Sequence, residues 1–495
     1  MRKSVKGQEI WNDMRENDKM QGKKKNPNGN RQILITTYIF TVLFLLMLGN
    51  LVYFLVFQSE TVINSSYNKR QTLLAESVIR GKILGNDGEV LAETVQDGKG
   101  NDTRNYPYGR IFTHVVGHFS QGRTGIELMN NYKLLESHNN PIQNLMLQIS
   151  GEKVIGDDVY TTLDVELQET AYDALGNHKG AVVAMNPKTG EILAMVSKPD
   201  YDPNPSALDA SWNDLVNNGS GESNLVNRAT QGLYPPGSTF KIVTTLEYLR
   251  ENPKSYEKYQ YQCDGKADFD NVFIHCYGNT VHGNIDLKTS FAKSCNSSFA
   301  SIGEELNVKK YAKTTEELLF NQKLPCDIEY NKSSFVLNEK SGLEEKLHTA
   351  MGQGKTQITP YHSCLIVSAI ANDGILMKPF LVDKIESSEG NLVKKTKQKE
   401  YTQLTSKKEA RILTKYMEAV VEEGTAASLK GLGYSVAGKT GSAEYDSTKS
   451  SHAWFWGFAP ADDPEIAIAV IVESSGTGSE YAVPIAKQLF TTYLN

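Results

Sequence analysis

The sequence predicts an α/β (α+β) fold, in which helices surround an antiparallel sheet, behind a membrane anchor and a smaller mixed α+β domain. Three observations predict it. An uncharged apolar run covers residues 33–57. Strand-like runs precede a helical region that extends from residue 238 to about residue 371, and further strand-like runs follow residue 433 before a closing helix near 483–493. This order of elements is typical of helices packed on an antiparallel sheet.

The anchor comes first along the chain. Residues 33–57 are long enough to cross a bilayer with some tilt, since about 20 apolar residues in a helix suffice. The segment before them carries nine Lys or Arg, and such residues stay on the cytoplasmic side of a membrane. We therefore expect a cytoplasmic tail at 1–32, one spanning helix at 33–57 and an extracytoplasmic remainder. The length of the apolar run disfavours a cleaved signal peptide.

Two domains are expected after the anchor, a smaller one at 58–153 and a larger one at 154–495. Within the smaller domain, a helical stretch is predicted near 126–137. The formal net charge of −6 argues against a nucleic-acid partner, because a phosphate-binding surface needs an excess of basic residues.

The helical region of the larger domain opens with a serine and a lysine three positions apart, Ser238 and Lys241. Because the apolar residues of 242–250 have helical spacing, both side chains share one face of the first turn. A serine is a weak nucleophile and needs a neighbouring base. A lysine amine that is partly removed from water, near the positive end of a helix, loses its proton more readily. The pair is a candidate acylation centre.

The Ser-x-x-Lys pattern alone is weak, because it also begins at Ser66, Ser150, Ser255 and Ser290. Two later motifs give weight to Ser238. They are the Ser-x-Asn triplet Ser294-Cys295-Asn296 and the segment Lys439-Thr440-Gly441-Ser442. The three motifs in this order are typical of penicillin-binding proteins and class A β-lactamases.

A second Lys-Thr-Gly, Lys188-Thr189-Gly190, lies between apolar runs at 181–185 and 192–196. We interpret it as a hairpin turn and not as part of a site. Lys439 instead precedes two strand-like runs, 453–460 and 466–472. A lysine on a strand beside a serine pocket could bind a substrate carboxylate.

With these motifs the chain resembles the class B penicillin-binding proteins, which are membrane-anchored peptidoglycan D,D-transpeptidases. The resemblance covers nearly everything after the anchor and extends to Arg80-Gly81-Lys82-Ile83, Thr161-Thr162-Leu163-Asp164 and Gly352-Gln353-Gly354. It departs at Leu84-Gly85-Asn86, where the family often has Asp-Arg before its turn. The resemblance implies the transpeptidase fold that penicillin-binding proteins share with serine β-lactamases, with 58–153 as the pedestal domain.

The resemblance also implies what the motif residues do. Ser238 would form an acyl-enzyme with a stem peptide, with Lys241 as general base and Ser294 as proton relay. Asn296 would contact the substrate amide, and Lys439 and Thr440 would bind the terminal carboxylate. Gly441 and Ser442 would belong to the substrate-binding strand. The backbone N–H groups of Ser238 and Ser442 would form the oxyanion hole. The chemistry would need no cofactor. The implied partners are stem peptides, their lipid-linked precursor, β-lactam antibiotics and a SEDS-type glycan polymerase in the membrane.

The segment from the Ser238 helix to the triplet contains three cysteines and one histidine, Cys263, Cys276, His282 and Cys295, of which Cys295 is the middle residue of the triplet. Three thiolates and an imidazole make a complete tetrahedral zinc shell. Some rod-elongation members of the family bind zinc at this place with the same steps from Cys276 to His282 and from His282 to Cys295, which implies a structural zinc site that braces the triplet.

The residues leave alternatives open for this cluster. His275 could replace Cys276 as a ligand, Cys263 and Cys276 could form a disulfide in the oxidising exterior, or the thiols could be free and buried. The remaining cysteines, Cys326 and Cys364, are predicted to be core residues.

Other function classes fit these residues less well than a transpeptidase does. A hydrolytic relative, either a D,D-carboxypeptidase or a β-lactamase, would need a group that activates water, and no Glu-x-x-x-Asn of the class A kind is placed to supply it. A β-lactam sensor would need a larger cytoplasmic module than residues 1–32. A non-catalytic cell-wall scaffold would not need Ser238, Lys241 and Lys439 to be intact.

Overall fold

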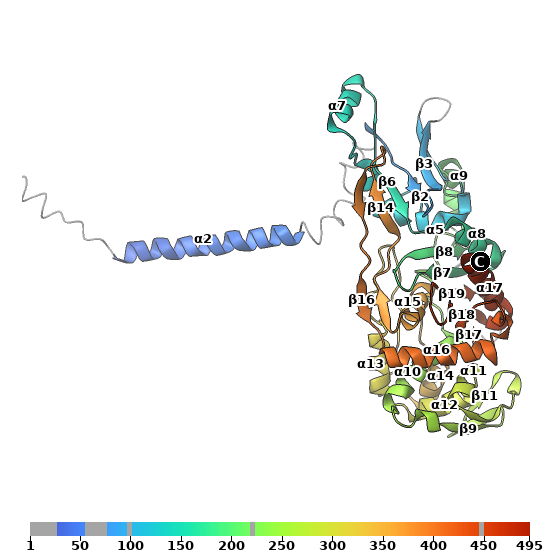
Figure 1. The fold of residues 1–495 in the computed structure, drawn as a ribbon. Helices are drawn as coiled ribbons and strands as arrows, with labels where there is room; N and C mark the ends of the chain where they lie inside the picture. Colours follow the sequence, from blue (N-terminus) through green and yellow to red (C-terminus); the bar gives the residue numbers. More distant parts are fainter. Residues whose placement is uncertain (1–26, 55–76, 97–100, 218–222, 445–449) are drawn as a thin grey trace, which may run out of the picture. The chain divides into compact units, whose positions relative to one another are not determined.

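The computed structural model of the chain describes residues 27–54, 77–96, 101–217, 223–444 and 450–495. It divides into two compact units, residues 1–68 and 69–495 (Figure 1). The first contains helix α2 (Pro27–Tyr53), of which Arg31–Tyr53 has a mean hydropathy of 2.0 and is long and apolar enough to cross a membrane. The predicted span of 33–57 begins within this helix, and residues 55–57 lie outside the described residues.

One sheet of the second unit has, within the described residues, six strands in the order β15-β14-β6-β2-β3-β4. Strand β6 pairs in parallel with β2 and antiparallel with β14. The β14–β15 hairpin, which comes late in the chain, therefore extends a sheet whose other strands lie between residues 83 and 161. The strands are β2 (Ile83–Leu84), β3 (Val90–Gln96), β4 (Asp102–Asn105), β6 (Asp158–Thr161), β14 (Val382–Glu386) and β15 (Leu392–Lys395).

A buried ion-pair network lies beside this sheet. The Glu127 carboxylate accepts hydrogen bonds from Arg80 Nε and Arg104 Nε, both at 2.7 Å. Burial alone would raise the pKa of Glu127, but the charges and hydrogen bonds of Arg104 and Arg80 lower it to about 2. The network thus holds a charged carboxylate in the core of the unit.

The helix predicted near 126–137 is wrong in its length. The structure has a short helix α6 (Gly125–Met129) and a separate 3-10 turn at Lys133–Leu135. The helix ends because Asn131 is fully buried and its side-chain Oδ1 accepts a hydrogen bond of 2.6 Å from Arg80 Nη1. A tertiary contact therefore overrides the local apolar spacing.

The second sheet positions the site. It has, among the described residues, five strands in the order β17-β18-β19-β7-β8, and every neighbouring pair is antiparallel. This confirms the predicted antiparallel sheet. Lys188-Thr189-Gly190 forms the turn between β7 and β8, where Asn186 N donates to Glu191 O at 2.9 Å, so the predicted hairpin is also confirmed. The strands are β7 (Gly180–Met185), β8 (Ile192–Lys198), β17 (Ala437–Ala443), β18 (His452–Ala459) and β19 (Ile466–Val472).

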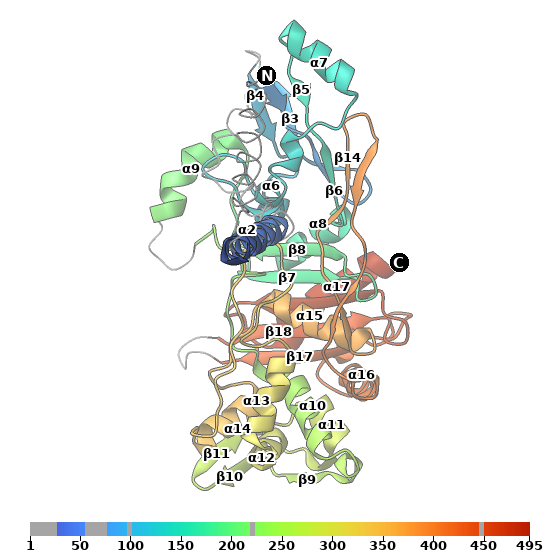
Figure 2. The same cartoon turned by 90° about the vertical axis from the view of Figure 1, so that its left-hand side faces the viewer.

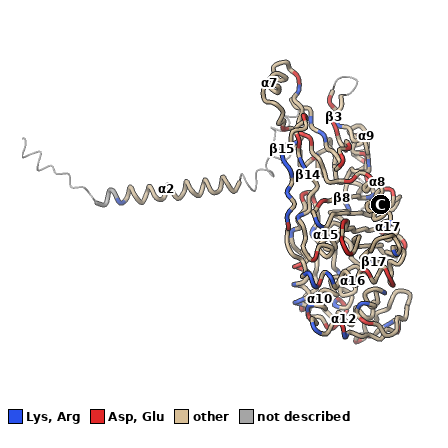
Figure 3. Tube along the Cα trace, in the orientation of Figure 1, with Lys and Arg blue, Asp and Glu red and all other residues tan. Residues whose placement is uncertain are grey.

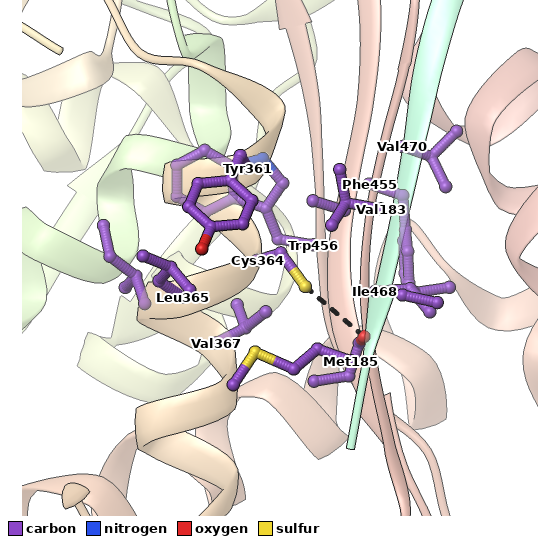
Figure 4. Packing of buried hydrophobic residues seen from close by; sticks show 14 of the residues in the cluster. Val183, Met185, Tyr361, Cys364, Leu365, Val367, Phe455, Trp456, Ile468 and Val470 are labelled. Carbon is purple, nitrogen blue, oxygen red and sulfur yellow. Dashed lines mark hydrogen bonds between the residues drawn. The ribbon is translucent and has the colours of Figure 1, made fainter. Parts of the chain in front are cut away.

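Helices cover both faces of this sheet. Side chains alternate along a strand, so Trp456 and Phe455 of β18 point to opposite sides. Trp456 lies against helix α15 (Pro360–Ala371), where Cys364 Sγ donates to Ala467 O at 3.5 Å (Figure 4). Phe455 packs edge-on against Phe490 of helix α17 (Val483–Leu494), with ring centroids 6.2 Å apart. Cys364 is a core residue as predicted, whereas Cys326 is only half-buried.

Beyond β17 lies a region of helices and short strands (Figures 1 and 2). Helix α16 (Lys407–Glu422) runs beside β17, and the cleft described below lies where this region meets the sheet. Charges of both signs are interspersed over the second unit, while α2 carries only Arg31 (Figure 3). The elements beyond β17 are α10 (Lys241–Glu251), β9 (Gln260–Cys263), β10 (Lys266–Phe269), β11 (Val272–His275), β12 (Gly283–Asp286), α11 (Leu287–Ala292), α12 (Asn296–Glu305), α13 (Val308–Glu317) and α14 (Leu343–Met351).

Candidate active site

Ser238 lies in a 3-10 turn, Gly237–Phe240, that runs directly into α10. Gly237 has a φ of 56°, and a Cβ atom there would lie 3.0 Å from the backbone N of Ala443 in β17. Glycine is favoured here because it adopts this backbone conformation without strain and lets two backbones approach closely. The turn therefore packs flush against β17 and presents Ser238 at the edge of the sheet.

Lys241 is fully buried one turn into the same helical segment. Its Nζ donates to Ser294 O and Asn296 Oδ1, both at 2.8 Å, and lies 3.2 Å from Ser294 Oγ. Among the hydrogen bonds of the described residues, none joins Lys241 to the Ser238 hydroxyl. Contacts of this kind often tighten only when substrate is bound.

Lys439 is also fully buried and extends from β17 to the same hydroxyl. Its Nζ lies 3.0 Å from Ser294 Oγ and 3.0 Å from the carbonyl oxygen of Thr440. The Ser294 hydroxyl thus joins two lysines that come from a helix and a strand. No carboxylate among the described residues is within hydrogen-bonding distance of either amine.

The two lysines lose protons more easily than exposed lysines. Burial lowers the pKa of Lys241 to about 8, although the neighbouring thiols of Cys295 and Cys276 oppose the shift. Burial, followed by the charge of Lys241, lowers the pKa of Lys439 well below its usual value. A neutral lysine can accept a proton from a serine hydroxyl, which is the property a general base needs.

The triplet adopts a strained backbone. Ser294 has a φ of 56°, which is uncommon for a residue with a side chain and recurs at functional sites. Asn296 starts helix α12, and its Nδ2 donates to His275 O at 3.0 Å while its Oδ1 faces Lys241. The side chain of Asn296 therefore has a fixed orientation.

These residues meet at a cleft of about 1100 Å³. Six of the residues expected to act on substrate line it, while Lys241 and Lys439 lie buried next to them. The six are Ser238, Ser294, Asn296, Thr440, Gly441 and Ser442.

The structure also brings together the sulfur and nitrogen ligands anticipated from the sequence. The potential ligand atoms of Cys263, Cys276, His282 and Cys295 all lie within 4.8 Å of one another. Cys276 Sγ lies 3.7 Å from both Cys263 Sγ and Cys295 Sγ. The cysteines are free thiols and form no disulfide. His275 lies outside the cluster, since its Nδ1 is 3.0 Å from Asn279 Oδ1.

Sequence reasoning missed one residue of the site, Thr425. It follows helix α16, lines the cleft and shares a hydrogen bond between hydroxyl groups with Thr440. A Gly-Thr pair after an amphipathic helix carries no spacing signal, so only the fold could reveal it. Gln353 also lines the cleft; its segment belonged to the resemblance, but no role was assigned to it.

A mixed fold with an antiparallel sheet, and an open cleft beside two buried lysines, are typical of penicillin-binding transpeptidases. The chain belongs to the penicillin-binding proteins, as a class B member. Residues 180–491 match the family of the penicillin binding protein transpeptidase domain, and residues 80–159 match that of the penicillin binding protein A dimerisation domain. Together with this family, helix α2 indicates a membrane-anchored transpeptidase.

Individual relatives agree with this assignment. The peptidoglycan D,D-transpeptidase PbpA of Mycolicibacterium smegmatis is 30% identical over 476 residues, which cover 90% of this chain and 95% of the relative. The D,D-transpeptidase domain of a peptidoglycan glycosyltransferase from Eggerthella lenta has a TM-score of 0.75 at 31% identity and covers 84% of this chain and 98% of its own. Penicillin-binding protein A from M. tuberculosis, solved as a ceftriaxone acyl-enzyme complex, has a TM-score of 0.77 at 29% identity and covers 85% of this chain and 100% of its own.

Proposed function

We propose that this protein is a peptidoglycan D,D-transpeptidase that works through an acyl ester on Ser238. The observation that carries the proposal is the pair of buried lysines on either side of the Ser294 hydroxyl, next to the cleft that Ser238 lines. A relative that is named a peptidoglycan D,D-transpeptidase supports peptidoglycan as the class of substrate. The solved acyl-enzyme complex of a relative supports covalent capture of β-lactams.

In the proposed acylation step, Ser238 Oγ attacks the carbonyl carbon of the penultimate D-Ala of a stem peptide, and its proton passes to the neutral amine of Lys241. The backbone N–H groups of Ser238 and Ser442 stabilise the oxyanion. The C–N bond to the terminal D-Ala then breaks. Ser294 gives its proton to the leaving amine and takes one from Lys241.

Substrate binding uses the remaining groups. Asn296 donates to the substrate backbone, and Lys439 and Thr440 hold the terminal carboxylate. That carboxylate leaves with D-Ala. The amine of a neighbouring stem then attacks the ester carbon and gives a proton to the neutral amine of Lys241. The bond to Ser238 Oγ breaks as the new peptide bond forms, and Ser238 Oγ takes the proton back from Lys241. The experiment that tests this function supplies glycan strands with pentapeptide stems and measures released D-Ala together with cross-linked and shortened stems. Cross-links are expected; D-Ala release with only shortened stems would indicate a D,D-carboxypeptidase, and no release would indicate a scaffold.

We also propose the order of parts along the chain: a cytoplasmic tail at 1–32, a span at 33–57, a pedestal at 58–153 and the catalytic domain at 154–495. The nine Lys or Arg before the span support this orientation. It places Ser238 outside the membrane, where peptidoglycan is found. Protease treatment of intact cells should then degrade the catalytic domain and leave the tail protected.

A structural zinc ion is proposed at Cys263, Cys276, His282 and Cys295. Tetrahedral zinc with Zn–S bonds of about 2.3 Å separates two sulfur ligands by about 3.8 Å, and the observed Sγ–Sγ distances are 3.7 Å. Zinc binds cysteine as the thiolate, and the contact between Cys276 and Cys295 lowers the pKa of Cys276 while it raises that of Cys295. The ion would supply no reaction chemistry. It would hold Cys295 in place between Ser294 and Asn296.

A SEDS-type glycan polymerase is proposed as the membrane partner. Helix α7 (Pro141–Ser150) supports a protein contact on the pedestal, because it has no buried residue and no charge. Its exposed apolar side chains have the i, i+3, i+4, i+7 spacing of a helix that docks in a groove. The replacement Leu145→Glu should abolish co-purification of a co-expressed polymerase while β-lactam acylation persists. The side chains are Ile142, Leu145, Met146 and Ile149.

A further inference from the structure

The segment Gly352-Gln353-Gly354 contacts both halves of the proposed oxyanion hole. On one side, Gly237 N, next to Ser238, donates to Gly352 O at 3.0 Å. On the other side, Gln353 Nε2 donates to Ser442 O at 3.2 Å, and Gln353 Oε1 accepts from Glu444 N at 3.2 Å. One short segment therefore connects the nucleophile turn to β17.

The backbone around Gln353 is fixed. Gly352 ends helix α14 with a φ of 85°, and a Cβ atom there would lie 1.8 Å from Gly237 O. Gln353 N donates to His348 O at 2.8 Å, which closes the last turn of the helix. The side-chain amide of Gln353 thus starts from a rigid position.

The contact with β17 matters because β17 is an edge strand. In the sheet order it has β18 on one side and no strand on the other among the described residues. Unpaired edge groups have no ladder to fix their direction. Gln353 accepts one N–H and donates to one C=O of this edge, as a residue of a neighbouring strand would do.

We propose that Gln353 is a positioning residue, which fixes the backbone at Ser442 so that its N–H group converges with that of Ser238 on the reacting carbonyl. A donor must lie within hydrogen-bonding distance of the position of the developing oxyanion to contribute. Gln353 acts on β17 and does not touch the reacting atoms. This inference rests on the acyl-serine chemistry proposed above.

The test uses full-length Gln353→Met, which keeps the side-chain length but loses both hydrogen bonds, and Gln353→Glu, which keeps an acceptor for Glu444 N. Gln357→Met is the matched control, because Gln357 is also half-buried and does not line the cleft. For each protein, the rate constant of acylation by benzylpenicillin and the preceding binding constant are measured separately. The carbonyl stretching frequency of the acyl ester is recorded by infrared difference spectroscopy.

Gln353→Met is expected to lower the acylation rate constant about tenfold to hundredfold, with little change in the binding constant. The ester frequency should rise, because the carbonyl accepts weaker hydrogen bonds, and Gln353→Glu should be intermediate. Unchanged rates and frequencies in both variants, or faster acylation in Gln353→Met, would overturn the role of Gln353. A wild-type chain that is never acylated would instead refute the proposed function itself, so the two failures are distinguishable.

Discussion

The Nζ atom of Lys439 lies 3.0 Å from the hydroxyl oxygen of Ser294, although 145 positions separate the two residues in the chain. A hydroxyl group has one proton to donate. With Lys241 Nζ at 3.2 Å on its other side, the Ser294 hydroxyl lies between two buried amines, and in the proposed mechanism it passes a proton from Lys241 to the leaving amine of D-Ala.

The first prediction concerns pH. Lys241 must be neutral to accept the proton of Ser238, and burial places its pKa at about 8. The second-order rate constant for acylation by benzylpenicillin should therefore rise with pH as the neutral fraction increases and become level above about pH 8. Stopped-flow measurements from pH 6 to 9.5 give this profile. A rate that stays constant across the range would exclude Lys241 as the base.

The second prediction separates the hydroxyl of Ser294 from its backbone. Ser294→Ala and Ser294→Gly both remove the relay, so both should slow acylation by about 10² to 10⁴. Glycine tolerates the φ of 56° and alanine does not. In denaturant titrations, the free energy of unfolding of Ser294→Gly should therefore exceed that of Ser294→Ala by about 1 kcal/mol. Equal stability of the two variants would show that the backbone conformation stores no strain.

The third prediction concerns recognition of the carboxylate. Benzylpenicillin should acylate the wild-type protein much faster than its methyl ester does, because the ester has no charge for Lys439 and Thr440 to bind. Lys439→Met should strongly slow acylation by benzylpenicillin and should slow acylation by its methyl ester much less. Equal slowing of both compounds would assign Lys439 to proton transfer alone.

The fourth prediction tests the buried ion-pair network of Glu127, Arg80 and Arg104. Glu127→Gln leaves Arg80 and Arg104 without a counter-charge and should cost about 3–5 kcal/mol of unfolding free energy. Glu136→Gln is the control, since its partly exposed pair with Lys133 should be worth about 1 kcal/mol or less. Because the pKa of Glu127 is lowered, the stabilisation is complete above its ordinary value of 4.5 and is lost as the pH falls towards about 2. Denaturant titrations at neutral and acid pH measure both effects.

The fifth prediction concerns the metal. The wild-type protein should contain one zinc per chain, and Cys263→Ser should lose it and melt at lower temperature. Cys326→Ser is the matched control, because Cys326 lies outside the cluster. Elemental analysis and thermal melting give the result. Wild-type protein without zinc, or with a disulfide between Cys263 and Cys276, would refute the site.

The sequence was most informative where chemistry needs particular residue types. Three ordered motifs predict Ser238, Lys241, Ser294 and Lys439, and the structure brings Lys241, Ser294 and Lys439 into contact. Lys188 lies in a hairpin turn as predicted, because two apolar runs on either side of a turn are a local signal.

Long-range contacts explain what the sequence could not predict. The helix near 126–137 was overestimated because the buried Asn131 binds Arg80, 51 positions away. The hydrogen bond between Thr425 and Thr440 exists only because α16 packs beside β17. Strands β14 and β15 join a sheet formed mostly by the first part of the chain, and no local pattern indicates that partner.

The most direct test of acyl transfer by Ser238 is the intact mass of the full-length protein before and after benzylpenicillin, with Ser238→Ala measured in parallel. We expect a persistent increase of one drug mass in the wild type, located on the peptide that contains Ser238, and no increase in the variant. An adduct of equal size in Ser238→Ala, or folded wild-type protein that gains no mass, would contradict it.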